Sequence, residues 1–157
     1  MRVAVSWLPT SDERDWIEHV AQAAEVVYPS EYDCNWSRFA CDPAVLSTMI
    51  RTADALIGWA PPTREAIMAA ERLRFLAWLH AGCDPLDLHL LAQRGVQVAN
   101  VRGANSVAVA EHAMALLLAL AKRIRENDTA AREVRWQGWW EAATASTELF
   151  GLSLIHI

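Results

Sequence analysis

Residues 55–85 decide the fold and have the sequence ALIGWAPPTREAIMAAERLRFLAWLHAGCDP. Two β-type runs, Ala55–Trp59 and Arg74–Leu79, flank a segment of helical composition. Pro61-Pro62 ends the first run, and Thr63 is suited to cap the helix that follows. A strand, a helix and a second strand in this order predict a βαβ unit, whose two strands pair in parallel.

The same alternation continues on both sides of this unit. The predicted strands, in chain order, are Val3–Trp7, Glu25–Tyr28, Ala55–Trp59, Arg74–Leu79 and Val96–Ala99. The predicted helices between them cover 10–24, 42–52, a segment after Thr63 and 84–91, the last with Gly95 as its C-cap. The first helix should present Trp16, Ile17, Val20 and Ala24 on one face, and the second should turn Val45, Leu46, Met49 and Ile50 inward. This pattern predicts an α/β fold, a flavodoxin-like doubly wound parallel sheet of about five strands with helices on both faces.

The pattern changes after Asn100. A short turn precedes a long helix that Asn105 or Ser106 should cap and that should reach Arg125. This helix is apolar almost all round, so it needs cover from several sides. A second, polar helix is expected from Thr129 to Trp140. We therefore expect residues 1–100 to form one domain and residues 101–151 to begin another.

Composition narrows the class of protein. Of the 157 residues, 54% are hydrophobic and 21% are charged, which is typical of a folded globular chain. The net charge of −5 gives no reason to expect nucleic acid or an anionic membrane as a partner. Three cysteines without a C-x-x-C pair argue against a disulfide framework or a zinc site and favour a reducing cytoplasm. The longest apolar stretch, Val107–Ala121, is shorter than the roughly 18 residues of a membrane span.

Taken alone, the residues contain no catalytic or cofactor-binding motif. The six glycines include no G-x-G, so neither a dinucleotide loop nor a P-loop is expected. No G-x-S-x-G and no histidine pair at metal spacing occur. Glu111 and His112 are neighbours on a helix and therefore point in different directions.

The candidate binding residues follow predicted strands. Residues 80–87, HAGCDPLD, come where the fourth strand ends, and ligands bind at the carboxyl ends of parallel strands. Gly82 would let a carboxylate approach the backbone there. Trp59 follows the third strand on the same rim. From these residues alone, a plain strand–turn–helix connection and a packing tryptophan are the commoner alternatives. Trp136, Trp139 and Trp140 form a further cluster suited to a hydrophobic partner.

Three segments together resemble the D-2-hydroxyacid dehydrogenases. Residues 98–120, VANVRGANSVAVAEHAMALLLAL, are similar to the family's strand ending in Asn, short loop and helix with V-A-E-H. Residues 80–87 resemble its G-x-D-x-x-D turn, and Glu148–Gly151 resembles the E-L-x-G before its nucleotide-binding strand. The resemblance covers residues 1–151.

This resemblance implies site residues and partners. Ala81 and Gly82 match positions whose amides hold the substrate carboxylate, Trp59 matches a pocket-lining position, and Asn105 matches an asparagine beside the substrate in formate dehydrogenase-like relatives. Residues 1–100 would be the substrate-binding domain and residues 101–151 the start of a Rossmann domain that binds NAD or NADP. The substrate would be a small 2-keto or 2-hydroxy acid, as in hydroxypyruvate and glyoxylate reductases. The 105–125 helix would be a homodimer contact.

The family's catalytic Arg, Glu and His and its G-x-G-x-x-G lie beyond the matched residues, so the resemblance implies an inactive fragment. The ending LSLIHI, residues 152–157, departs from the family pattern. It matches one translation of the transposase end sequence used in sequencing libraries, so we expect an adapter-derived tail; a genuine strand is the alternative.

Two other functions remain open. The first is a non-catalytic flavodoxin-like binding or regulatory module. A phosphoacceptor receiver would need acidic residues where Ser6-Trp7 and Gly58-Trp59 stand. The second is a small interaction protein that uses the Trp136–Trp140 surface.

Overall fold

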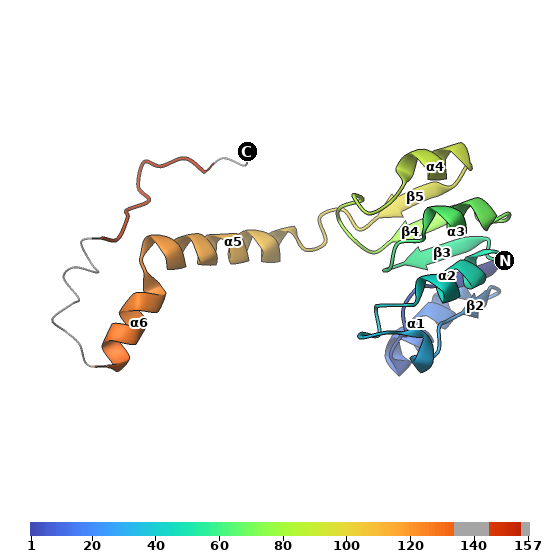
Figure 1. The fold of residues 1–157 in the computed structure, drawn as a ribbon, viewed down its shortest axis with the longest axis horizontal. Helices are drawn as coiled ribbons and strands as arrows, with labels where there is room; N and C mark the ends of the chain where they lie inside the picture. Colours follow the sequence, from blue (N-terminus) through green and yellow to red (C-terminus); the bar gives the residue numbers. More distant parts are fainter. Residues whose placement is uncertain (134–144, 155–157) are drawn as a thin grey trace. The chain divides into compact units, whose positions relative to one another are not determined.

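A computed structural model of the chain describes residues 1–133 and 145–154 (Figure 1). The chain divides into two compact units, Met1–Ala104 and Asn105–Ile157.

The first unit is built on a five-stranded parallel sheet. Its strands are β1 (Arg2–Val5), β2 (Glu25–Val27), β3 (Ala55–Gly58), β4 (Phe75–Trp78) and β5 (Gln97–Asn100). Their order across the sheet is β2-β1-β3-β4-β5, and every neighbouring pair is parallel. This is the flavodoxin-like order, so the predicted fold class is confirmed.

The helices of this unit are α1 (Ser11–Ala21), the 3-10 turn η1 (Glu31–Asp33), α2 (Pro43–Ile50), α3 (Arg64–Ala69) and α4 (Leu88–Gln93). Three predicted starts are confirmed by their caps. Thr10 forms a capping box with Glu13, the Asp42 carboxylate accepts from the Ala44 amide, and the Thr63 hydroxyl accepts from the Ala66 amide.

The predicted start of α4 at Asp84 was wrong. Asp84-Pro85 lies in a turn that the Leu86 amide closes on the Cys83 carbonyl at 2.9 Å. Asp87 is the N-cap instead, because its carboxylate accepts from the Leu90 amide at 2.9 Å and also pairs with Arg64 of α3. The helix therefore begins at Leu88.

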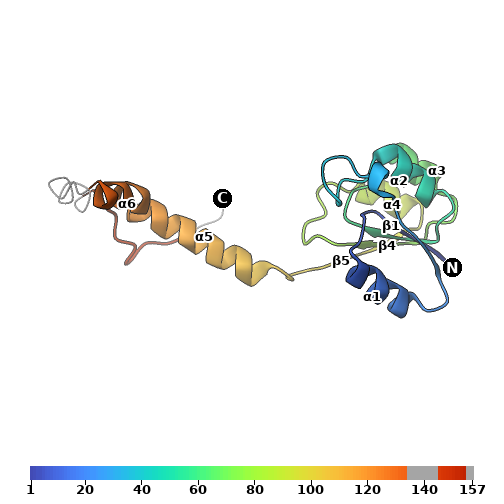
Figure 2. The same ribbon diagram turned by 90° about the horizontal axis from the view of Figure 1, so that it is seen from below.

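Figure 2 shows α2, α3 and α4 on one face of the sheet and α1 on the other. The larger core lies under the three helices and includes Leu46, Ile50, Leu56, Ile67, Leu76 and Trp78. Val45 and Met49 pack against it partly buried, as predicted for α2. The smaller core consists of Val5, Trp7 and Ile17.

The predicted apolar face of α1 was only partly right. Ile17 is buried, but Trp16 is 67% exposed and Val20 is 59% exposed. Ala24 lies after the helix has ended. Within Met1–Ala104, α1 is the only helix on its face of the sheet, so no other helix of this unit buries its flanks.

The second unit contains α5 (Ser106–Ala121) and α6 (Ile124–Arg132). The prediction of one helix reaching Arg125 was wrong, as was the predicted start of the next at Thr129. The Lys122 amide bonds to the Leu118 carbonyl as the helix ends, and Arg123 takes a left-handed conformation with φ of 50°. The remainder of the predicted polar helix, with Trp136, Trp139 and Trp140, lies outside the described residues.

None of the helices within the described ranges combines the length and hydropathy that a membrane crossing requires.

Candidate functional site

The candidate site lies at the carboxyl edge of the sheet. In a parallel sheet the strands end at the same edge, so the residues after them gather there. Ser6 follows β1, Trp59 follows β3, and His80, Ala81 and Gly82 follow β4. The structure thus brings three of the four predicted site residues, Trp59, Ala81 and Gly82, to one edge.

The loop after β4 is fixed by two hydrogen bonds that its backbone carbonyl groups accept. The Trp78 indole Nε1 donates to the Gly82 carbonyl at 2.8 Å, and the Asn100 amide Nδ2 donates to the Ala81 carbonyl at 2.6 Å. Ala81 and Gly82 are both exposed. Among the residues that the structure describes, no protein acceptor receives either of their backbone N–H groups. Two fixed amides are therefore available to an anionic group.

Gly82 lies close to the side chain of Asp84. A Cβ atom at this position would lie 2.8 Å from the Asp84 carboxylate oxygen Oδ2, which is closer than real Cβ contacts allow. A side chain would have to displace Asp84 and would also shield the amide from a ligand. The glycine thus keeps the edge open.

Ser6 anchors the neighbouring loop, and the sequence analysis did not single it out as a site residue. Its side chain is fully buried, and Oγ accepts from the backbone amides of Trp59 at 2.6 Å and Ala60 at 3.0 Å. The signal was a lone hydroxyl at the end of an apolar strand, which must find partners when buried. Ser6 fixes the backbone from which the Trp59 ring projects.

Aromatic rings form the wall of this edge. The Trp59 ring, 37% exposed, stacks on Phe39 with 4.5 Å between centroids. His80 lies against Trp59 at 4.7 Å and Trp78 at 4.5 Å, and its Nε2 is 2.9 Å from the Trp59 carbonyl oxygen. His80 thereby ties the Trp59 loop to the loop of Ala81. Phe39 is a site residue that was not predicted, and His80 lies in the predicted segment 80–87 but had been given no role of its own.

Arg38, beside the aromatic wall, is already neutralised. Arg38 Nη1 and Nη2 donate to the two Glu13 carboxylate oxygens at 2.5 Å and 3.1 Å. The Arg38 hydrogen bond, and then the bond from the Thr10 amide, lower the pKa of Glu13 to about 2. The guanidinium also lies over the Phe39 ring, 4.1 Å from its centroid. Arg38 therefore acts as a brace for Phe39.

This ion pair predicts an acid-dependent loss of stability. The pKa of Glu13 is lower in the folded chain than in the unfolded chain, so the ionised carboxylate stabilises the fold at pH values above its ordinary pKa. This contribution is lost as pH falls from ~5 to ~2. Because the pair is more than a third exposed, we expect Glu13→Gln to cost only about 0.5–1 kcal/mol at neutral pH. Urea unfolding should show a flatter pH profile for the variant than for the parent chain.

Glu71→Gln is the matched control, since no ion pair or side-chain hydrogen bond of Glu71 occurs among the described residues. Equal pH profiles for Glu13→Gln and the parent would mean that the pair does not stabilise the fold.

Residues 8–149 match the family described as D-isomer specific 2-hydroxyacid dehydrogenase, catalytic domain. The chain belongs to this family. The resemblance noted from the sequence is thereby confirmed.

Individual relatives agree with this assignment. D-3-phosphoglycerate dehydrogenase of Mycobacterium leprae is 31% identical over 136 residues, which are 85% of this chain and 25% of that protein. Glyoxylate reductase of Korarchaeum cryptofilum is 34% identical over 98 residues, 61% of this chain and 30% of that protein. The holo form of Rhodotorula graminis D-mandelate dehydrogenase superposes with a TM-score of 0.69 at 25% identity, covering 94% of this chain and 45% of that one. The chain thus spans less than half the length of these dehydrogenases.

The first unit of this family member does not fit a dinucleotide. The connection from β1 to α1, Ser6–Thr10, contains no glycine, and the Glu13 carboxylate already accepts from the Thr10 amide at the helix N-terminus, at 2.9 Å. A phosphate placed there would meet a negative charge. In addition, no three His, Cys, Asp or Glu side chains within the described ranges are grouped to hold a metal ion.

Asn105, the fourth predicted site residue, belongs to the second unit. It is the N-cap residue of α5, as predicted, and its side chain makes no capping hydrogen bond. Ser106 is the first residue of the helix.

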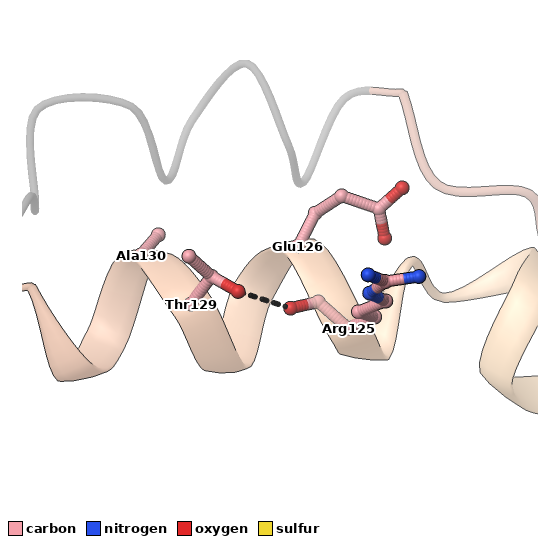
Figure 3. A pocket seen from close by; sticks show the side chains of 4 residues that line it. All are labelled: Arg125, Glu126, Thr129 and Ala130. Atoms are coloured by element: carbon pink, nitrogen blue, oxygen red, sulfur yellow. Dashed lines mark hydrogen bonds between the residues drawn. The ribbon is translucent and has the colours of Figure 1, made fainter.

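A hollow of about 440 Å³ lies along α6, and Figure 3 shows four residues that line it. Arg125 and Glu126 bring opposite charges, and the Thr129 hydroxyl donates back to the Arg125 carbonyl at 3.0 Å. These four residues offer neither an apolar wall nor a surplus of one charge, so we assign no ligand to the hollow.

Proposed function

We propose that the chain is part of an NAD(P)-dependent oxidoreductase that interconverts a small D-2-hydroxy acid and its 2-keto acid. Family membership supports the reaction class. The observation that carries the proposal for this chain is the pair of available amides at Ala81 and Gly82, held in place at the carboxyl edge of the sheet. In this proposal residues 1–100 are the substrate-binding domain and residues 101–151 begin the nucleotide-binding domain.

Each site residue has a proposed role. The N–H groups of Ala81 and Gly82 donate to the substrate carboxylate, a strong interaction because the acceptor is charged. Trp59, braced by Phe39 and His80, lines the side of the pocket that holds the substrate side chain. Asn105 lies beside the substrate in the assembled enzyme.

Arg38 is paired with Glu13, whereas Arg102, two residues after β5 at the same edge of the sheet, forms no ion pair within the described residues. We propose hydroxypyruvate or glyoxylate as the substrate on the family resemblance, with glyoxylate reductases among the relatives.

Hydride exchange with a 2-hydroxy acid needs a nicotinamide, which would supply the two-electron chemistry. No glycine loop for its phosphates occurs anywhere in the 157 residues, so we propose that this chain alone does not turn over substrate. The catalytic Arg, Glu and His of the family also have no matching positions in it. We further propose a cytoplasmic protein that dimerises through the 105–125 region.

Nuclear magnetic resonance of the ¹⁵N-labelled chain tests the binding site. Added glyoxylate or hydroxypyruvate at ~10 mM should shift the amide resonances of Ala81 and Gly82, since a Kd of about 1 mM corresponds to only about 4 kcal/mol of binding free energy. The uncharged methyl ester should leave them in place. Gly82→Val should abolish the shifts, while Ala92→Val, at an exposed position near the end of α4, should preserve them.

Two results would contradict the proposal. Unchanged Ala81 and Gly82 resonances at saturating keto acid would show that these two amides do not bind the carboxylate. Oxidation of NADH by the purified chain with either keto acid, above a heat-treated control, would show that the missing loop is not required.

A further inference from the structure

Two cysteines face each other across the base of a loop that the sequence left unassigned. Cys34 and Cys41 form an isolated antiparallel bridge. The backbone bonds around it run from the Asn35 amide to the Ala40 carbonyl, 3.0 Å, and from the Asp42 amide to the Asp33 carbonyl, 2.7 Å. Both bonds belong to flanking residues, so the cysteines are a non-hydrogen-bonded pair.

Such pairs bring their side chains together on one side of the ladder. Their Cα atoms are about 4.5 Å apart, and their Cβ atoms are closer than in the alternate type of pair. A disulfide requires a Cα separation of about 4.4–6.8 Å and a Cβ separation of about 3.5–4.5 Å. Cys34 is half-buried, Cys41 is buried, and both are free thiols. Cys83 follows β4, in another loop.

We propose that Cys34 and Cys41 form an oxidation site that closes an intramolecular disulfide when the protein meets a hydroperoxide. The more exposed Cys34 sulfur takes one oxygen from hydrogen peroxide, which breaks the O–O bond and releases the other oxygen as water. The Cys41 sulfur then attacks the Cys34 sulfenic acid, the S–S bond forms, and the sulfenic oxygen leaves as a second water. Two thiols are oxidised and one peroxide is reduced.

The disulfide would fix a loop that reaches the candidate site. The tip between the cysteines carries Arg38, which is paired with Glu13, and Phe39, which stacks on Trp59. The Arg38 carbonyl also accepts from the Leu8 amide at 2.8 Å. Closing the base of the loop therefore restrains the aromatic wall. The site itself does not depend on the proposed enzymatic function, and a reversible disulfide of this kind is compatible with a reducing compartment.

Burial, and then local negative charge, makes the oxidation of these thiols slow at neutral pH. Burial raises the pKa of Cys34, and Asp33 adds to the rise. Burial first, then Cys34 and the carboxylates of Asp33 and Asp42, raise the pKa of Cys41 to about 11. The nearby Arg38 charge is compensated by Glu13. Because the thiolate is the form that reacts with peroxide, the initial rate of oxidation should rise up to about tenfold per pH unit near neutrality.

Trypsin mapping of the full chain provides the test, since cleavage after Arg38 separates the two cysteines into peptides 15–38 and 39–51. The reduced chain is treated with hydrogen peroxide, alkylated and digested without reductant. We expect these two peptides to be joined, with a mass two hydrogen atoms below their sum, and free thiols to fall from three to one. Amide exchange in residues 35–40 should slow in the oxidised chain.

Cys34→Ser and Cys34→Ala should abolish the joined peptide, and Cys83→Ser, the matched control, should retain it. Unchanged circular dichroism of the Cys34 variants shows that they fold. A joined peptide containing Cys83, a disulfide between labelled and unlabelled chains, or Cys34 sulfinic acid without any joined peptide would each overturn the proposal.

Discussion

Trp78→Ala is expected to lower the free energy of unfolding by about 3–5 kcal/mol, close to the whole stability of a marginal domain. The Trp78 side chain is only 2% exposed and lies in the larger core at the end of β4. Its removal leaves a cavity under the three helices and also frees the Gly82 carbonyl that the indole N–H holds at 2.8 Å. Urea unfolding of a chain ending at Ala104 measures the effect.

Two further substitutions separate packing from the hydrogen bond. Trp36→Ala is the matched control, because Trp36 is 89% exposed and its loss should change stability by less than about 0.5 kcal/mol. Trp78→Phe retains most of the packing and loses the indole N–H, so it should cost about 1–2 kcal/mol and should also weaken the keto-acid shifts at Gly82. Similar losses for Trp78→Ala and Trp36→Ala would show that Trp78 does not support the core.

The order of strands and helices could be predicted because its signals are local. Short apolar runs and capping residues such as Thr10 and Asp42 specify elements through neighbours within a few positions. The start of α4 could not be predicted in this way. Asp84 and Asp87 are both suitable N-cap residues. Asp87 is the N-cap in the structure, and it also forms an ion pair with Arg64 of α3.

Part of the candidate site could likewise be predicted from the sequence. Ala81 and Gly82 follow a strand directly, so their place at the edge of the sheet follows from the fold. Phe39 comes from an unassigned loop and meets Trp59 only in three dimensions. The Ser6 hydroxyl likewise finds its partners on a different strand-end loop. The sequence shows that the Ser6 hydroxyl needs a partner, but it does not show which residues Ser6 and Phe39 meet.

The second large effect that we expect is self-association through α5. No residue of this helix is buried, and its exposed apolar side chains include Val107 at 72%, Leu116 at 53% and Leu120 at 80%. Burying one such side chain contributes about 1.5–3 kcal/mol, so several together rival the roughly 5–15 kcal/mol that stabilises a domain. Light scattering should therefore report dimers or larger species for the full chain and a monomer for a chain ending at Ala104.

Matched variants test whether α5 is responsible. Replacing both Leu116 and Leu120 by lysine should restore a monomer, because charged side chains on this surface oppose its burial. Val20→Lys, at a comparably exposed apolar position on α1, should leave the association unchanged. A monomeric full chain whose α5 amides resist hydrogen exchange would mean that the chain itself covers the helix, and the proposed dimer contact would then lose its physical basis.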